Sequence, residues 1–103
     1  MHRLPVACDP SAFGSADVFA AHMTEGRRLL SRALDRRELP DGWALRLPND
    51  DGTLLYNARR IVDERRCCPF FTFALDSEPL PGALWLRITG PEGAKDALRA
   101  ELM

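Results

Sequence analysis

The chain lacks long hydrophobic runs. No segment of its 103 residues approaches the roughly 20 consecutive apolar residues that a membrane-spanning helix needs. The stretch from Met1 to Phe13 also has no apolar run of the length found in signal peptides. We therefore expect a cytoplasmic protein, in a compartment where thiols stay reduced.

Neither sign of charge is in large excess. The 14 basic residues are interleaved with 15 acidic ones, and the net charge is -1. No broad basic surface for nucleic acid or for an anionic membrane is expected. The length suits one α+β domain over residues 1–103, and a 46% hydrophobic content is enough to build a core.

Familiar catalytic motifs are also missing. The sequence has no phosphate loop, no dinucleotide fingerprint, no Ser-His-Asp order and no Cys-x-x-Cys. Its only histidines are His2, near the terminus, and His22, beside an apolar stripe where a packed or surface role is the simpler interpretation. It does contain three cysteines, which in a reducing compartment are free thiols, metal ligands or catalytic groups rather than a disulfide framework.

The spacing of apolar residues predicts an α+β fold of order β-α-β-β-α-β-β-α. The simplest packing is an antiparallel sheet with helices on one face. Ser15 is a suitable helix N-cap, and Asp41-Gly42 is a hairpin signal. The expected elements are a strand at Leu4–Cys8, a helix at Ser15–Leu34, strands at Arg36–Pro40 and Trp43–Pro48, a turn at Asn49–Gly52, a helix at Thr53–Arg66, strands around Phe71–Leu75 and Leu84–Ile88, and a last helix opened by Pro91 with Ala94, Ala97, Leu98 and Leu102 inward.

The sequence contains a possible internal repeat. Residues 39–47 align without gaps on residues 80–88, and each segment follows a helix with paired arginines, Arg27-Arg28 or Arg59-Arg60. Chance similarity is the alternative. If the repeat is real, residues 67–71 have no counterpart in the first copy.

The most distinctive chemical feature is the pair Cys67-Cys68 before Pro69. The second helix must end near Cys67, because the residue before a proline is pushed out of the α region. Cys68 follows Ile61 by seven positions and continues the buried stripe, whereas Cys67 lies about 100° away around the helix. We expect Cys68 to be buried and Cys67 to be at least partly reachable by solvent. That both are only core residues remains an alternative.

Adjacent thiols are suited to soft ions, which deprotonate their own ligands. A third sulfur could come only from Cys8, which is expected at the end of the first strand. A site of Cys8, Cys67 and Cys68 suits a metal or metalloid such as trivalent arsenic or antimony, or mercury(II), held for sequestration or hand-over. Tetrahedral zinc would require a fourth ligand.

Three segments resemble a known family: residues 6–8, residues 64–70 and residues 84–93, which include Val6-Ala7-Cys8 and Cys67-Cys68-Pro69-Phe70. The family consists of short, mostly uncharacterised bacterial proteins, some of which accompany mercury- and arsenic-type resistance systems. The resemblance spans most of the chain, and Cys-Cys-Pro-Phe is its most specific part. It implies a role for Cys8, Cys67 and Cys68 and favours soft-metal binding, but it implies no mechanism.

An enzyme is the second hypothesis. Cys67 would be the attacking thiol and Glu64 the proton donor in a thiol-dependent redox or carbon-metal bond-cleaving reaction. The negative end of a helix disfavours a thiolate, while Arg65 and Arg66 oppose that effect. For Glu64, a solvated helix residue paired with arginine is the simpler interpretation.

The third hypothesis is an interaction module with structural cysteines. Trp85 and Arg87 alternate with the apolar residues of their strand and therefore point to the opposite face of the sheet. An exposed Trp-Arg surface is typical of interfaces, so we expect a homodimer through this face. Coverage by the last helix or a loop is the alternative.

Overall fold

The computed structural model describes residues 14–102, with side chains as far as Arg99. The order of elements is α1 (Ala16–Ser31), β1 (Asp35–Leu39), β2 (Gly42–Leu47), α2 (Asp51–Cys67), β3 (Thr72–Ser77), β4 (Leu84–Thr89) and α3 (Ala94–Leu102). The expected α+β fold is confirmed for this part of the chain. The expected strand at Leu4–Cys8 and the inward side chain of Leu102 lie outside what is described.

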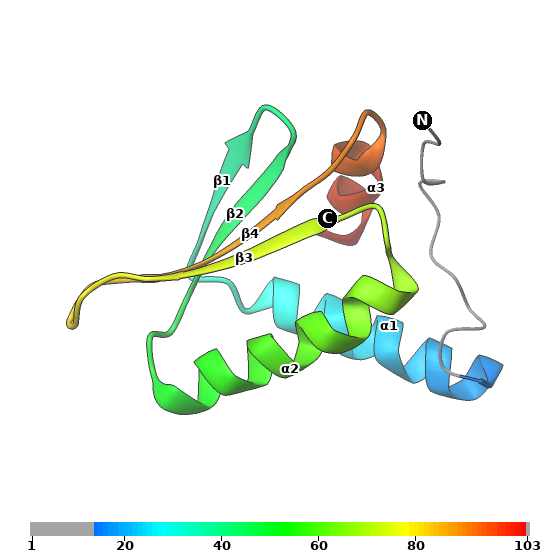
Figure 1. Ribbon diagram of the computed structural model, residues 1–103, viewed down its shortest axis with the longest axis horizontal. Coiled ribbons are helices and arrows are strands. Elements are labelled where there is room, and N and C mark those ends of the chain that lie inside the picture. Colours follow the sequence, from blue (N-terminus) through cyan, green and yellow to red (C-terminus); the bar gives the residue numbers. More distant parts are fainter. Residues whose placement is uncertain (1–13, 103) are drawn as a thin grey trace.

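One antiparallel sheet has the strand order β1-β2-β4-β3. The Asp-Gly hairpin is confirmed, since Leu39 pairs with Gly42 across a short turn. Figure 1 shows α1 and α2 together on one side of the sheet. The core on that side includes Leu45 and Leu84, which are fully buried, and Leu98 of α3. Among the described residues, then, the helices pack on one face, as expected.

The two central strands pair symmetrically. Leu45 lies opposite Leu86, and the pairs on either side are Trp43 with Ile88 and Leu47 with Leu84. Residues that the repeat aligns are thus related by an approximate two-fold axis between β2 and β4. The outer part of the alignment fails, because Leu39 is in a strand whereas its counterpart Leu80 is in a loop. Duplication remains a hypothesis.

Local hydrogen bonds set the helix boundaries. The α2 helix begins at Asp51, earlier than expected, because the side chain of Asp50 accepts from the Thr53 amide at 2.8 Å. The α1 helix has the expected cap at Ser15 but ends at Ser31. Beyond it, the Leu34 amide donates to the Arg46 carbonyl of β2 at 2.7 Å, so Leu34 is bonded to the sheet.

Helix faces differ from the expected stripes at a few positions. On α2, Asn57 is buried, whereas Ala58, which precedes Ile61 by three positions and so falls on the apolar stripe that Cys68 continues, is exposed. On α3, Ala94 and Leu98 are buried as expected, but Ala97 is exposed. Of the helices within residues 14–102, none has both the length and the apolar character needed to span a bilayer.

Candidate functional site

The two thiols lie where α2 ends. Cys67 is the last helical residue, and Cys68 has φ -123° and ψ 73°, outside the α region as expected before Pro69. Two backbone bonds fix this junction: the Cys68 amide donates to the Glu64 carbonyl at 2.7 Å, and the Phe71 amide donates to the Cys68 carbonyl at 3.2 Å. The thiols are therefore held between a helix and a tight turn.

The two sulfur atoms lie side by side. Their separation of 3.6 Å is a hydrogen-bond contact, and it is far longer than the roughly 2.05 Å of a disulfide. If both thiols were ionised, an ion about 2.3 Å from each sulfur, as in zinc thiolate sites, would subtend an angle of about 103°. That angle is close to tetrahedral, so the pair suits chelation of one ion without a change of backbone.

Both thiols are buried. Cys68 is 3% exposed, as expected, but Cys67 is 0% exposed, so the expected access of solvent to Cys67 is wrong. Cys67 and Cys68 share an apolar cluster with Phe70 and with Ala94 of α3, against which Phe19 of α1 packs. The last turn of α2 is therefore covered by side chains from neighbouring elements, which helical phase alone does not reveal.

The expected third ligand, Cys8, lies outside the described residues, as does His2. Among the residues whose side chains are described, 14–99, no three His, Cys, Asp or Glu side chains gather closely enough to hold a metal ion. The described part of the chain therefore brings together two of the three expected ligands.

A polar cluster one turn before the thiols was not expected. The Oε1 atom of Glu64 lies 2.7 Å from an Arg60 nitrogen and 2.8 Å from Nε2 of His22. Arg60 also lies 3.1 Å from His22 Nδ1. Because a guanidinium only donates, Nδ1 accepts, and the proton of a neutral imidazole is on Nε2. The pairing of Glu64 with an arginine was expected. A solvated position was expected as well, but the Glu64 side chain is only 21% exposed.

The sequence does carry a signal for the position of Glu64. Leu54, Asn57, Ile61, Glu64 and Cys68 recur at intervals of three or four, which is one face of a helix. Asn57 and Glu64 are polar, so a search for apolar residues passes over them. Polar residues at such positions are candidates for a site.

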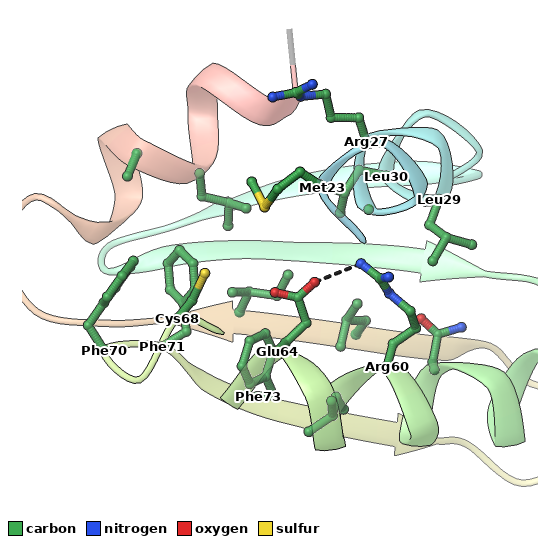
Figure 2. A pocket seen from close by; sticks show the side chains of 17 residues that line it. Met23, Arg27, Leu29, Leu30, Arg60, Glu64, Cys68, Phe70, Phe71 and Phe73 are labelled. Carbon is green, nitrogen blue, oxygen red and sulfur yellow. Dashed lines mark hydrogen bonds and ion pairs between the residues drawn. The ribbon is translucent and has the colours of Figure 1, made fainter. Parts of the chain in front are cut away.

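This face of α2 borders a cavity of about 200 Å³ between the sheet and the helices. Glu64 and Cys68 both line it, whereas Cys67 does not. Figure 2 shows the Glu64 carboxylate projecting from α2 between Cys68 and Arg60, below Met23 of α1. The remaining walls are mainly apolar and include Leu30, Ile61, Phe71, Phe73, Leu86, Ile88 and Leu98.

The Trp85 face of the sheet is a second distinct surface. Trp85 is half-buried, and the Arg37 guanidinium lies 4.4 Å from the centre of its ring. Arg87 pairs with Asp76 at 3.0 Å. The α3 helix does not cover this face, because its residues Lys95 and Arg99 lie over Trp43 on the other face. What packs against Trp85 is therefore an arginine of the same sheet.

Comparisons of this chain with protein-family models, with curated proteins and with solved structures found no match.

Proposed function

We propose that the protein binds a soft metal or metalloid ion, namely arsenic(III), antimony(III) or mercury(II), through Cys67 and Cys68, with Cys8 as the third ligand. Its role would be sequestration or hand-over in a reducing compartment. The observation that supports this most directly is the 3.6 Å separation of the two sulfur atoms at a backbone-fixed junction. Soft thiolates select soft ions, and two adjacent sulfurs supply a chelate.

Preorganisation is the physical advantage of this junction. Cys68 is the C-cap of α2 and precedes Pro69, so few torsions remain to be ordered when an ion binds. Burial also excludes competing water from an ion–sulfur bond. An ion would approach from the cavity that Cys68 lines, and Cys67 would close the chelate from behind.

The test is a titration of reduced protein with arsenite, antimonite and mercury(II), followed by mass spectrometry and sulfur-to-metal absorption. We expect one ion per chain with a dissociation constant below about 1 µM for at least one of the three. Cys67→Ala and Cys68→Ala should each weaken binding strongly, and Cys8→Ala should weaken it by removing the third sulfur. Met23→Leu, which removes a thioether from the cavity wall while nearly conserving volume, is the matched control and should bind as the unmodified protein does.

Two outcomes would reject this function. One is the absence of tight binding for all three ions. The other is unchanged binding when Cys67 and Cys68 are both replaced by alanine in a protein whose circular dichroism shows that it is folded. Loss of binding in the Met23→Leu control would point to the cavity wall and not to the thiols.

A thiol-dependent enzyme is the second candidate, because a thiol and the Glu64 carboxylate border one cavity. The reactive thiol would be Cys68, since Cys67 is fully buried and does not line that cavity. Measuring the reaction rate of each thiol with a disulfide reagent across pH tests this proposal. Ordinary thiol reactivity at Cys68, with titration near pH 8.5, would count against an enzyme.

A further inference from the structure

The cavity has its own recognition chemistry, separate from the thiol chelate. We propose that it binds a neutral, single-ring aromatic alcohol or phenol, with the ring among the apolar side chains and the hydroxyl donating to Glu64. This proposal does not depend on ion binding.

Size limits the occupant to about one ring. The cavity measures about 200 Å³. A dry apolar cavity of about 150 Å³ in another protein accepts benzene, so the space here suits one ring with a small substituent. A fused two-ring molecule with substituents would require the walls to move.

The walls favour an aromatic body. Phe70, Phe71 and Phe73 form a chain of rings along one side, with centroid separations of 4.4 Å and 5.9 Å and tilted or edge-on geometry. A further ring could continue this edge-to-face arrangement. Ile88 of the sheet and Leu98 of α3 supply aliphatic contacts on other sides.

Arg27, Asn57, Arg60 and Glu64 are the polar residues that line the cavity, and of these Glu64 offers an acceptor to a ligand. In Figure 2 the Arg27 guanidinium is directed away from Glu64. Arg60 uses its terminal nitrogens on the His22 ring at 3.1 Å, the His22 carbonyl at 3.3 Å and Glu64 at 2.7 Å. The contacts of Glu64 with Arg60 and His22 use its Oε1 atom, while Oε2 makes no hydrogen bond or ion pair among the residues whose side chains are described, 14–99. In Figure 2 this second oxygen is directed to the side of Cys68, away from Arg60. A ligand must therefore donate a hydrogen bond here.

The charges of Arg60 and Glu64 disfavour a ligand that is itself charged. The Arg60 guanidinium beside the carboxylate opposes an ammonium ligand, and the carboxylate itself opposes an anionic one. Because Arg60 already compensates the charge of Glu64, an ammonium ligand would lose more hydration than its contact with the carboxylate returns, and an anionic ligand would be repelled by that carboxylate. A neutral hydroxyl loses little hydration and gains a charge-assisted hydrogen bond.

The experiment compares 4-methylphenol with toluene, which has the same ring and methyl group but no hydroxyl. Binding is followed by chemical-shift titration, and the site by intermolecular NOEs from ring protons to the methyl groups of Met23 and Ile88. We expect NOEs to both residues and an affinity about tenfold higher for 4-methylphenol than for toluene. Benzoate and benzylamine, which carry opposite charges, should not bind measurably.

Two substitutions of like chemistry on α2 separate the cavity from the surface. Ile61→Phe fills the cavity and should abolish binding of 4-methylphenol, whereas Leu55→Phe, at a residue that is 70% exposed, should leave it unchanged. Glu64→Gln should remove most of the preference over toluene. Cys67→Ala, outside the cavity lining, should remove ion chelation and leave binding of 4-methylphenol intact.

Either of two results would overturn the proposal. Equal affinity for toluene and 4-methylphenol would show that Glu64 does not accept a hydrogen bond from the ligand hydroxyl. Equal effects of Ile61→Phe and Leu55→Phe, with both variants folded by thermal melting, would place the ligand elsewhere. Loss of ion binding alone, in the Cys67→Ala variant, would bear only on the proposed function.

Discussion

Adjacent residues can have different surroundings, and Cys67 and Cys68 are an example. Both belong to one apolar cluster, but only Cys68 also lines the cavity. Phe70 and Ala94 belong to the same cluster as both sulfurs. Reagents that enter the cavity therefore meet Cys68 first.

Brief alkylation of native, reduced protein should accordingly label Cys68 before Cys67, the reverse of the order expected from helical phase. The expected difference is several-fold, because a fully buried thiol reacts only after local opening. Mass spectrometry of digested protein at successive times measures it. Denatured protein is the control and should show similar rates at both positions. Faster labelling of Cys67 would contradict the burial described here.

The contact between Glu64 and Arg60 should contribute more to stability than a surface ion pair. Their side chains are 21% and 13% exposed, and His22 lies against both. We expect Glu64→Gln to lower the free energy of unfolding by about 1–3 kcal/mol, less than for a fully buried pair, because some solvent remains. Urea unfolding measures this loss.

A double-mutant cycle with Arg60→Met isolates the pair itself. The matched comparison is Asp96 with Arg99, which are also on one helix but are 80% and 44% exposed at 3.6 Å. That surface pair should have a coupling of no more than about 0.5 kcal/mol. Equal couplings for the two pairs would mean that burial of Glu64 adds nothing.

At the scale of elements, α2 positions the site because both of its ends are fixed. Asp50 caps the beginning by accepting from the Thr53 amide at 2.8 Å and the Thr53 hydroxyl at 2.9 Å. Pro69 follows the C-cap at the other end. Because both ends of α2 are fixed, Glu64 and Cys68 keep their positions relative to the sheet.

The N-cap of α2 should make stability depend on pH. The Thr53 amide, and then the Thr53 hydroxyl, lower the pKa of Asp50 below its ordinary value of 3.8. Because the folded-state pKa is the lower one, the contribution is fully present above the unfolded-state value and is lost as pH falls through the folded-state pKa. The advantage of the unmodified protein over Asp50→Asn, which keeps a cap acceptor, should shrink on acidification from pH 7 to pH 3.

Urea unfolding at a series of pH values measures this dependence. Asp51→Asn is the control, because Asp51 has the same charge in the first turn of α2 but makes no cap hydrogen bond in the described part of the chain. Its difference from the unmodified protein should vary less with pH. A pH-independent difference for Asp50→Asn would reject the assignment of the cap charge.

At the scale of the whole molecule, α1, α2 and α3 pack on one face of the sheet and do not cover the Trp85 face. Arg37 lies over the Trp85 ring, and Arg87 pairs with Asp76, so the surface combines an aromatic residue with charges of both signs. Such a surface is self-complementary in a two-fold dimer, because each arginine can meet an acid of the partner.

We expect a homodimer through this face, and sedimentation equilibrium at rising protein concentration tests it. Trp85→Ala with Arg87→Ala should shift the equilibrium to monomer. Lys95→Ala is the control, because Lys95 belongs to α3 on the opposite side of the sheet, and this substitution should leave the equilibrium unchanged. A strictly monomeric protein at the highest concentrations would remove this interpretation. Replacing Cys67 and Cys68 by alanine should leave assembly unchanged.

The sequence alone determined the fold class, the hairpin at Asp41-Gly42 and the end of α2 before Pro69. It also identified Cys67-Cys68 as the chemical feature. These properties depend on local causes: alternation of side chains in a strand, turn chemistry, and the steric clash that a proline imposes on its predecessor. Such causes act between neighbouring residues and can be read without knowing what packs against them.

Tertiary structure decided the burial of Cys67 and the cavity, together with the contacts among His22, Arg60 and Glu64. His22 and Arg60 are 38 positions apart, and their contact exists only because α1 packs beside α2. Cys67 is buried because Ala94 and Phe19 pack around it, and both belong to elements distant in sequence. Burial depends on the sum of all neighbours, so helical phase gives the direction of a side chain but not what covers it.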